Sequence, residues 1–213
     1  REAAAIAAAH PKVRWIRPSR AEREESPEQP AVPLEGLVLD SPRSTIHGGA
    51  LRGCVLHKLM EETLNGTLEE DPRQVAVRAA QLIHQLGGQA HASPDDGPCP
   101  DEIASAVLRS LCLPIVRGHR ERLIPEYTVL GAAGDDRGLD LTAGIADAVA
   151  LDEEGRVTLV IDWKSDVCPA EDARAQYRAQ MRQYLNALQC SHGALVYVTL
   201  GLVDEVHRAL AKG

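Results

Sequence analysis

Phenylalanine is absent from this 213-residue chain, and tryptophan and tyrosine bring the aromatic share to only 3%. The core must therefore consist mostly of Leu, Val, Ala and Ile, which the apolar share of 44% readily provides. No apolar run approaches the roughly 20 residues that a membrane helix needs, and no signal peptide is visible. These absences predict a cytoplasmic protein without a membrane partner, and the length suits one domain.

Cysteine pairs of the C-x-x-C type are also missing. The five cysteines are scattered along the chain, so we expect neither a structural zinc site nor an iron–sulfur cluster. A net excess of basic charge is missing too, because the formal net charge is −8. That balance argues against sequence-independent nucleic-acid binding through a broad basic surface. Arginines do cluster locally, and each cluster is either a binding patch or a solvated face.

Residues 17–46 show no apolar periodicity and are rich in Pro, Ser, Glu and Arg, which is typical of a linker or extended arm. We therefore divide the chain into an arm over residues 1–47 and a domain over residues 48–213. The expected elements are helices over 48–64, 72–86 and 101–113, a strand over 122–130, a hairpin of strands over 144–151 and 157–161, a helix over 169–188, a strand over 193–200 and a short helix from about Asp204. Pro125 places the first strand at a sheet edge. This order predicts an α/β fold with a mixed central sheet flanked by helices and a helical insertion at about 67–120.

Lysine is scarce as well, with only four in a chain whose common cation is arginine. One lysine nevertheless closes an apolar strand, in the run Asp162-Trp163-Lys164. The preceding strand of the hairpin carries Asp147, so two carboxylates and an ammonium group are expected at one place. Carboxylates bind hard divalent cations, and a lysine beside them can orient water or hold phosphate charge. This is the equipment for metal-assisted hydrolysis of a phosphodiester, although an isolated Asp-x-Lys is more often a surface salt bridge.

Three further polar residues lie on the helix faces that, by helical periodicity, we expect to point into the protein. His57 follows Leu56 on the apolar side of the first helix, where a histidine is either a metal ligand or a core residue bonded to a carbonyl. Gln180 and Tyr184 lie one turn apart, so their side chains project from one face. Ordinary packing of the helix against the sheet explains this second pair equally well.

Four segments, R-G-C-V-L-H, G-I-A-D, V-I-D-W-K-S and Q-M-R-Q-Y, occur in this order with fitting helix and strand contexts. Together they resemble the RecB-like nuclease domain of the PD-(D/E)XK superfamily, most closely the C-terminal nuclease domain of AddA-type helicase–nuclease subunits. The resemblance covers residues from about 50 to 200 and implies a restriction-endonuclease-like core. The cysteine pattern of the iron–sulfur members is absent, and the second segment departs mildly from the usual G-x-(I/V)-D.

The resemblance assigns roles residue by residue. It implies that the metal ligands are His57, Asp147, Asp162 and the backbone carbonyl of Trp163. It implies that the catalytic residues are Asp162, Lys164, Gln180 and Tyr184. The implied cofactor is Mg²⁺, and the histidine also suits Mn²⁺. Glu126 stands where relatives often carry a strand glutamate, and no role follows for it.

The implied function is that of a metal-dependent DNA exonuclease or endonuclease within a bacterial helicase–nuclease that repairs double-strand breaks by recombination. Its partners would be single-stranded DNA, the helicase domain of the same longer chain and a second helicase–nuclease subunit. The arm would follow that helicase domain in the chain. These residues contain no G-x-x-x-x-G-K-[ST] phosphate loop. Two alternatives stay open: a non-catalytic module that guides DNA or docks in such a complex, and another nuclease of the superfamily, of restriction or repair type. The intact Asp147, Asp162 and Lys164 favour an enzyme.

Overall fold

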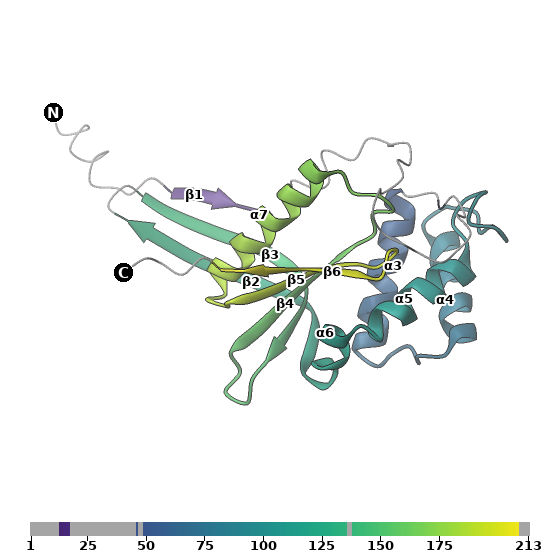
Figure 1. The fold of residues 1–213 in the computed structure, drawn as a ribbon, viewed down its shortest axis with the longest axis horizontal. Coiled ribbons are helices and arrows are strands. Elements are labelled where there is room, and N and C mark those ends of the chain that lie inside the picture. The colour runs from purple at the N-terminus through teal and green to yellow at the C-terminus, as the bar shows by residue number, and fades with distance from the viewer. Residues whose placement is uncertain (1–12, 18–45, 47–48, 136–137, 209–213) are drawn as a thin grey trace.

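The computed structural model describes residues 13–17, 46, 49–135 and 138–208 (Figure 1). The elements in this part of the chain are, in order, β1 (Val13–Ile16), α3 (Ala50–Leu64), α4 (Pro72–Gln85), α5 (Pro100–Leu111), α6 (Pro114–Arg117), the 3₁₀ turn η2 (Arg120–Arg122), β2 (Leu123–Asp135), β3 (Gly138–Leu151), β4 (Val157–Lys164), α7 (Glu171–Ala187), β5 (His192–Tyr197) and β6 (Leu202–His207). None of the helices described is both long and apolar enough to cross a membrane.

The strands form one mixed six-stranded sheet in the order β1-β3-β4-β5-β6, and β2 pairs with β3. Strand β3 is antiparallel to β2 and to β4, whereas β4 and β5 run parallel and α7 connects them. The α/β class, the mixed sheet and its flanking helices are therefore confirmed. The edge position expected from Pro125 is confirmed as well, because β2 pairs with β3 alone among the described strands.

Each face of the sheet has its own apolar core. On one face, α3, α4 and α5 pack against side chains such as Ile161 and Trp163 of β4. On the other, α7 packs through Met181, Tyr184 and Leu185 against a second cluster that includes Val160. Figure 1 shows α7 lying apart from the group formed by α3, α4 and α5. Because alternate residues of a strand face opposite sides, Asp162 and Lys164 lie on the α7 side, with Val160.

Sequence signals explain several element ends. Asp71 caps α4 by accepting hydrogen bonds from the backbone N–H groups of Arg73 and Gln74, and Pro72 occupies the first helical position. The hairpin between β3 and β4 turns at Gly155, whose φ of 77° favours glycine. The helices expected at 72–86 and 101–113 are observed as α4 and α5, inside the span expected to hold the helical insertion.

The short helix expected from about Asp204 is wrong, because residues 202–207 form strand β6. Gly201, with a φ of 65°, reverses the chain after β5, and β6 then pairs with β5 along its whole length. Pairing with a neighbour outweighs the weak local preference of this segment. Strand β1 was not expected, since it lies within the proposed arm. Most of that arm lies outside the described residues, and its division from the domain remains a prediction.

Candidate active site

The end of β4 brings an acid and a base together inside the protein. Lys164 Nζ lies 2.7 Å from Asp162 Oδ2, and only 5% and 9% of the two side chains are exposed. The two residues share a strand face because they are two positions apart. Removing both charges from water is costly unless the pair is well held. A surface salt bridge, the ordinary explanation for Asp-x-Lys, therefore does not describe this pair.

Helix α7 holds the ammonium group of Lys164 from the other side. Lys164 Nζ donates a hydrogen bond of 3.2 Å to Gln180 Oε1. It also lies 4.1 Å from the ring centre of Tyr177, where the face of the ring attracts a cation. The Tyr177 hydroxyl in turn donates to Asp166, at 3.0 Å from Oδ2. The lysine is thus fixed in position by a strand, a helix and the loop between them.

A second carboxylate, Asp147 on β3, lies beside this pair. Its Oδ2 accepts a 2.7 Å hydrogen bond from the backbone N–H of Trp163, and its Oδ1 lies 3.3 Å from Nδ1 of His57 on α3. Burial alone would raise the pKa of Asp147, but His57, the Trp163 N–H and Lys164 together hold it below its usual range. Asp147 is therefore charged at neutral pH.

His57 carries the matching positive charge in the metal-free protein. Burial alone would lower its pKa, but Asp147 and Asp162 raise the pKa of His57 to about 9 from an ordinary 6.5. Protonated His57 therefore stabilises the fold fully below about pH 6.5, and this stabilisation is lost as the pH rises through about 9. A bound cation would replace that proton, since metal ligands must be deprotonated.

Glu126 enters the site through an unusual backbone conformation. Its φ is 52°, in the left-handed region that a non-glycine residue rarely adopts. The β2–β3 ladder pairs the residues on both sides of it, so Glu126 stands opposite Asp147. Burial, Asp147 and Glu61 raise the pKa of Glu126, while His57 and Lys58 oppose the rise. Sequence reasoning gave this glutamate no role, and the structure places it beside the acids and the histidine.

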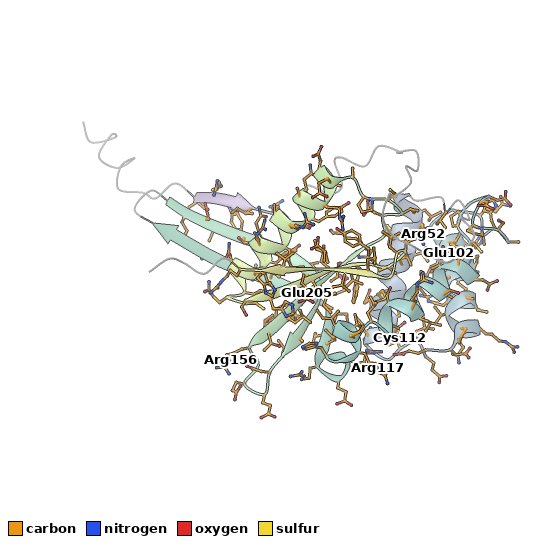
Figure 2. The ribbon with its side chains drawn as sticks, in the orientation of Figure 1. Arg52, Glu102, Cys112, Arg117, Arg156 and Glu205 are labelled. Carbon is orange, nitrogen blue, oxygen red and sulfur yellow. The ribbon has the colours of Figure 1, made fainter. Side chains whose placement is uncertain are left out.

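Arg52 fixes the loop that follows Lys164. Its guanidinium donates to Glu102 of α5 at 2.6 and 3.1 Å, to Thr199 Oγ1 at 2.8 Å and to the Ser165 carbonyl at 3.2 Å. Figure 2 shows Arg52 and Glu102 close together between α3 and α5. The next residue, Gly53, allows the close approach, because a Cβ there would lie 2.9 Å from Ser165 Oγ.

The structure brings most of the expected residues together. His57 and Asp147 are in contact, and Asp162, Lys164 and Gln180 form a chain of contacts. Tyr184 differs, because its hydroxyl donates to the Ile145 carbonyl at 2.9 Å and its side chain is wholly buried. That contact anchors α7 to β3, and a role on the phosphate stays a prediction. The ligand role of the Trp163 carbonyl also stays a prediction.

Sequence reasoning missed the contributions of Tyr177 and Arg52. Tyr177 precedes Gln180 by three residues, a spacing that places both on one helical face, and this was the available signal. Arg52 opens the segment R-G-C-V-L-H, but a surface arginine has the same local pattern. Its four hydrogen bonds join residues that are distant in sequence, so no local rule could identify them.

These side chains fit a divalent cation. Carboxylates and one imidazole are suitable ligands for Mg²⁺ or Mn²⁺. Burial is the largest cause of the raised pKa of Glu126, and repulsion from Asp147 and Glu61 adds to it. A cation would offset that repulsion, as metal sites commonly do.

Residues 35–209 match the family described as the PD-(D/E)XK nuclease superfamily. The chain belongs to this superfamily. PD-(D/E)XK proteins are typically metal-dependent nucleases, so this is a nuclease-type domain, and its mixed sheet between helices agrees with the restriction-endonuclease-like fold of the superfamily. The match extends to the superfamily and not to AddA-type subunits in particular.

No curated protein matches the chain significantly. Among solved structures, the chain is similar to one titled "Crystal structure of SSO0001", with 21% sequence identity and a TM-score of 0.37. That alignment covers 76% of this PD-(D/E)XK chain and 80% of the other chain.

Proposed function

We propose that this chain is a metal-dependent deoxyribonuclease that hydrolyses phosphodiester bonds. The observation that carries the proposal is the buried ammonium group of Lys164, held 2.7 Å from Asp162 and 3.2 Å from Gln180. A buried ion pair is weak support for stability, because apolar residues in its place are often equally stable. Its presence in a nuclease-type domain therefore favours a catalytic role over a structural one.

The chain's own residues divide the work. Asp147, Asp162, His57 and the Trp163 carbonyl would hold Mg²⁺ or Mn²⁺. When bound, the cation activates water and neutralises charge on the phosphate. Lys164 presents a positive charge that needs no reorganisation as negative charge develops.

Gln180 and Tyr177 both contact the ammonium group of Lys164 and hold it in place. Gln180 orients the ammonium group through its carbonyl oxygen. Tyr177 covers one side of it and shields it from water. Tyr184 fixes the position of α7 against β3 through its hydrogen bond to the Ile145 carbonyl.

The direct test compares Lys164→Met with Arg156→Gln on a labelled single-stranded DNA. Met preserves the apolar stem against Tyr177 and removes the charge. Arg156 lies on the exposed hairpin turn and serves as the control, with 73% of its side chain exposed. We expect Lys164→Met to lower the cleavage rate roughly 10²–10³-fold, the usual cost of losing a preorganised electrostatic group. Arg156→Gln should cleave at the wild-type rate.

Two results would decide against this proposal. A Lys164→Met protein with an unchanged circular dichroism spectrum and wild-type activity would remove the role of the lysine. A wild-type protein that cleaves no DNA with either Mg²⁺ or Mn²⁺ would favour the non-catalytic guiding or docking module instead. Chelation by EDTA should stop all cleavage if the cation is essential.

We further propose that this domain works within a helicase–nuclease for double-strand break repair. The support is the resemblance of its four sequence segments to AddA-type nuclease domains, together with the net charge of −8. An acidic domain gains little from sequence-independent attraction to DNA, so a motor that delivers a single strand would raise its effective concentration. Fluorescence anisotropy should show weak binding of a short single strand by the chain alone. Nanomolar, steeply salt-dependent binding would contradict this proposal.

A further inference from the structure

A second group of metal-binding side chains lies on the β5–β6 pair. His192 begins β5, and the ladder places it directly opposite His207 of β6. Glu205 lies two residues before His207, so it shares the same face of β6. The intervening Val206 is buried in the cluster beneath α7, which directs Glu205 and His207 to the other side of the sheet. Three potential ligands therefore project from one face of two paired strands.

The three side chains lie close together, so that side-chain rotation alone would bring them around one ion. His192 Nε2 lies 2.9 Å from Glu205 Oε2, and the rings of His192 and His207 stack with centroids 5.0 Å apart. One ligand atom from each of the three residues lies within 4.8 Å of the other two. The backbone ladder from His192↔His207 to Tyr197↔Leu202 holds the two strands in register, so little ordering remains to be done on binding.

This group is separate from the nuclease site. Lys164 is level with Tyr197 in the β4–β5 ladder, five residues along β5 from His192, or about 16 Å at the usual rise of a strand. Lys164 also lies on the α7 side of the sheet, whereas Glu205 and His207 lie on the other. Figure 2 shows Glu205 well away from Arg52 and Glu102, which flank the active site.

We propose that His192, Glu205 and His207 bind a borderline divalent cation, with Zn²⁺ as the best match. Two imidazoles and one carboxylate form a donor set that zinc sites use, with at least one position left for water. Mg²⁺ prefers oxygen ligands and competes poorly for imidazole. Since β6 ends the strand order of the described sheet, the ion would fasten an edge strand to its neighbour.

The test is a Zn²⁺ titration of the full chain by calorimetry in excess Mg²⁺, and Asp147→Asn is titrated in parallel to show any Zn²⁺ held at the nuclease site. We expect one Zn²⁺ to bind outside the nuclease site, in the wild type and in Asp147→Asn alike. His192→Ala/His207→Ala should bind it at least about 100-fold more weakly, because loss of even an outer partner of a ligand costs roughly 10–100-fold. His84→Ala, which removes an exposed histidine of α4, should bind as the wild type does. Zn²⁺ should also raise the melting temperature of the wild type and of His84→Ala, but not that of the double variant.

Glu205→Gln provides a second, milder variant in case the double alanine variant folds poorly, and it should weaken binding about 10-fold. The proposal is wrong if the wild type binds no Zn²⁺ in excess Mg²⁺, or if Glu205→Gln and a folded double variant both bind it as tightly as the wild type. It is also wrong if Asp147→Asn abolishes Zn²⁺ binding, because the ion would then belong to the active site. None of these measurements depends on nuclease activity, so failure of this proposal leaves the proposed function untouched.

Discussion

Replacing Glu102 with glutamine tests how the protein holds its active-site loop. Glu102 forms two hydrogen bonds with Arg52, whose side chain is only 2% exposed. The other two acceptors of that guanidinium, the Thr199 hydroxyl and the Ser165 carbonyl, are neutral. The substitution preserves the shape of the side chain and removes its charge. Arg52 would then remain buried without an opposite charge at this contact.

The expected loss of stability follows from that burial. Removing one partner of a buried pair costs roughly 3–5 kcal/mol, because the other charge stays uncompensated. Glutamine still accepts one hydrogen bond from Arg52, which favours the lower end of that range. Glu102 also lies in the first turn of α5, where a negative charge contributes roughly 0.3–1 kcal/mol. We therefore expect a loss of about 3 kcal/mol, a large share of the roughly 5–15 kcal/mol that stabilises a domain.

Urea unfolding followed by tryptophan fluorescence would measure this loss, since Trp163 is buried in the folded protein. The matched control is Glu154→Gln, which removes the same charge from an exposed pair with Arg156. Its cost should stay below about 0.5 kcal/mol, as is usual for surface pairs. If Glu102→Gln were no more destabilising than Glu154→Gln, Arg52 would not depend on its partner and the reasoning would fail.

Two further predictions concern packing and pH. Gly131→Ala should lower the free energy of unfolding in urea by about 2–3 kcal/mol, and Gly193→Ala should lower it by about 1 kcal/mol. A Cβ at Gly131 would lie 2.8 Å from the Ala187 Cα, whereas one at Gly193 would meet the flexible Met181 side chain; equal costs would contradict this ranking. In EDTA, the free energy of unfolding of the wild type should fall by about 1 kcal/mol between pH 6.5 and pH 9, relative to that of His57→Gln. The rise in the pKa of His57 from 6.5 to about 9 would be worth about 3 kcal/mol without solvent screening. Because 36% of the His57 side chain is exposed, solvent screening reduces this value. Parallel pH profiles of the two proteins would show that His57 carries no such charge.

The sequence allowed the β3–β4 hairpin and the position of its charged residues to be predicted because the signals there are local. Val157–Lys164 forms one apolar run with a carboxylate and an ammonium at its end, and Gly155 marks the turn before it. Strand periodicity then places Asp162 and Lys164 on one face without any knowledge of the rest of the fold. Gln180 was found for the same reason, because helical spacing alone turns it towards the sheet.

Other features depend on contacts between distant segments. Strand β6 was mistaken for a helix because its six residues lack a strong alternation, and its pairing with β5 decides the outcome. Strand β1 is only four residues long and pairs with the far end of β3, which sequence alone does not reveal. The position of Glu126 opposite Asp147 likewise requires the register of β2 against β3. Local propensity has no information on any of these partners.

The candidate site is also where the chain departs from what folding alone favours. The interior around β4 is otherwise apolar, yet Asp162 and Lys164 are buried there with Asp147 as a neighbour. Glu126 adds backbone strain that costs on the order of 1–3 kcal/mol. Well-packed apolar side chains would be at least as stable in the place of the ion pair. Because these costs coincide at one point of a nuclease-type domain, a function at that point explains them better than stability does.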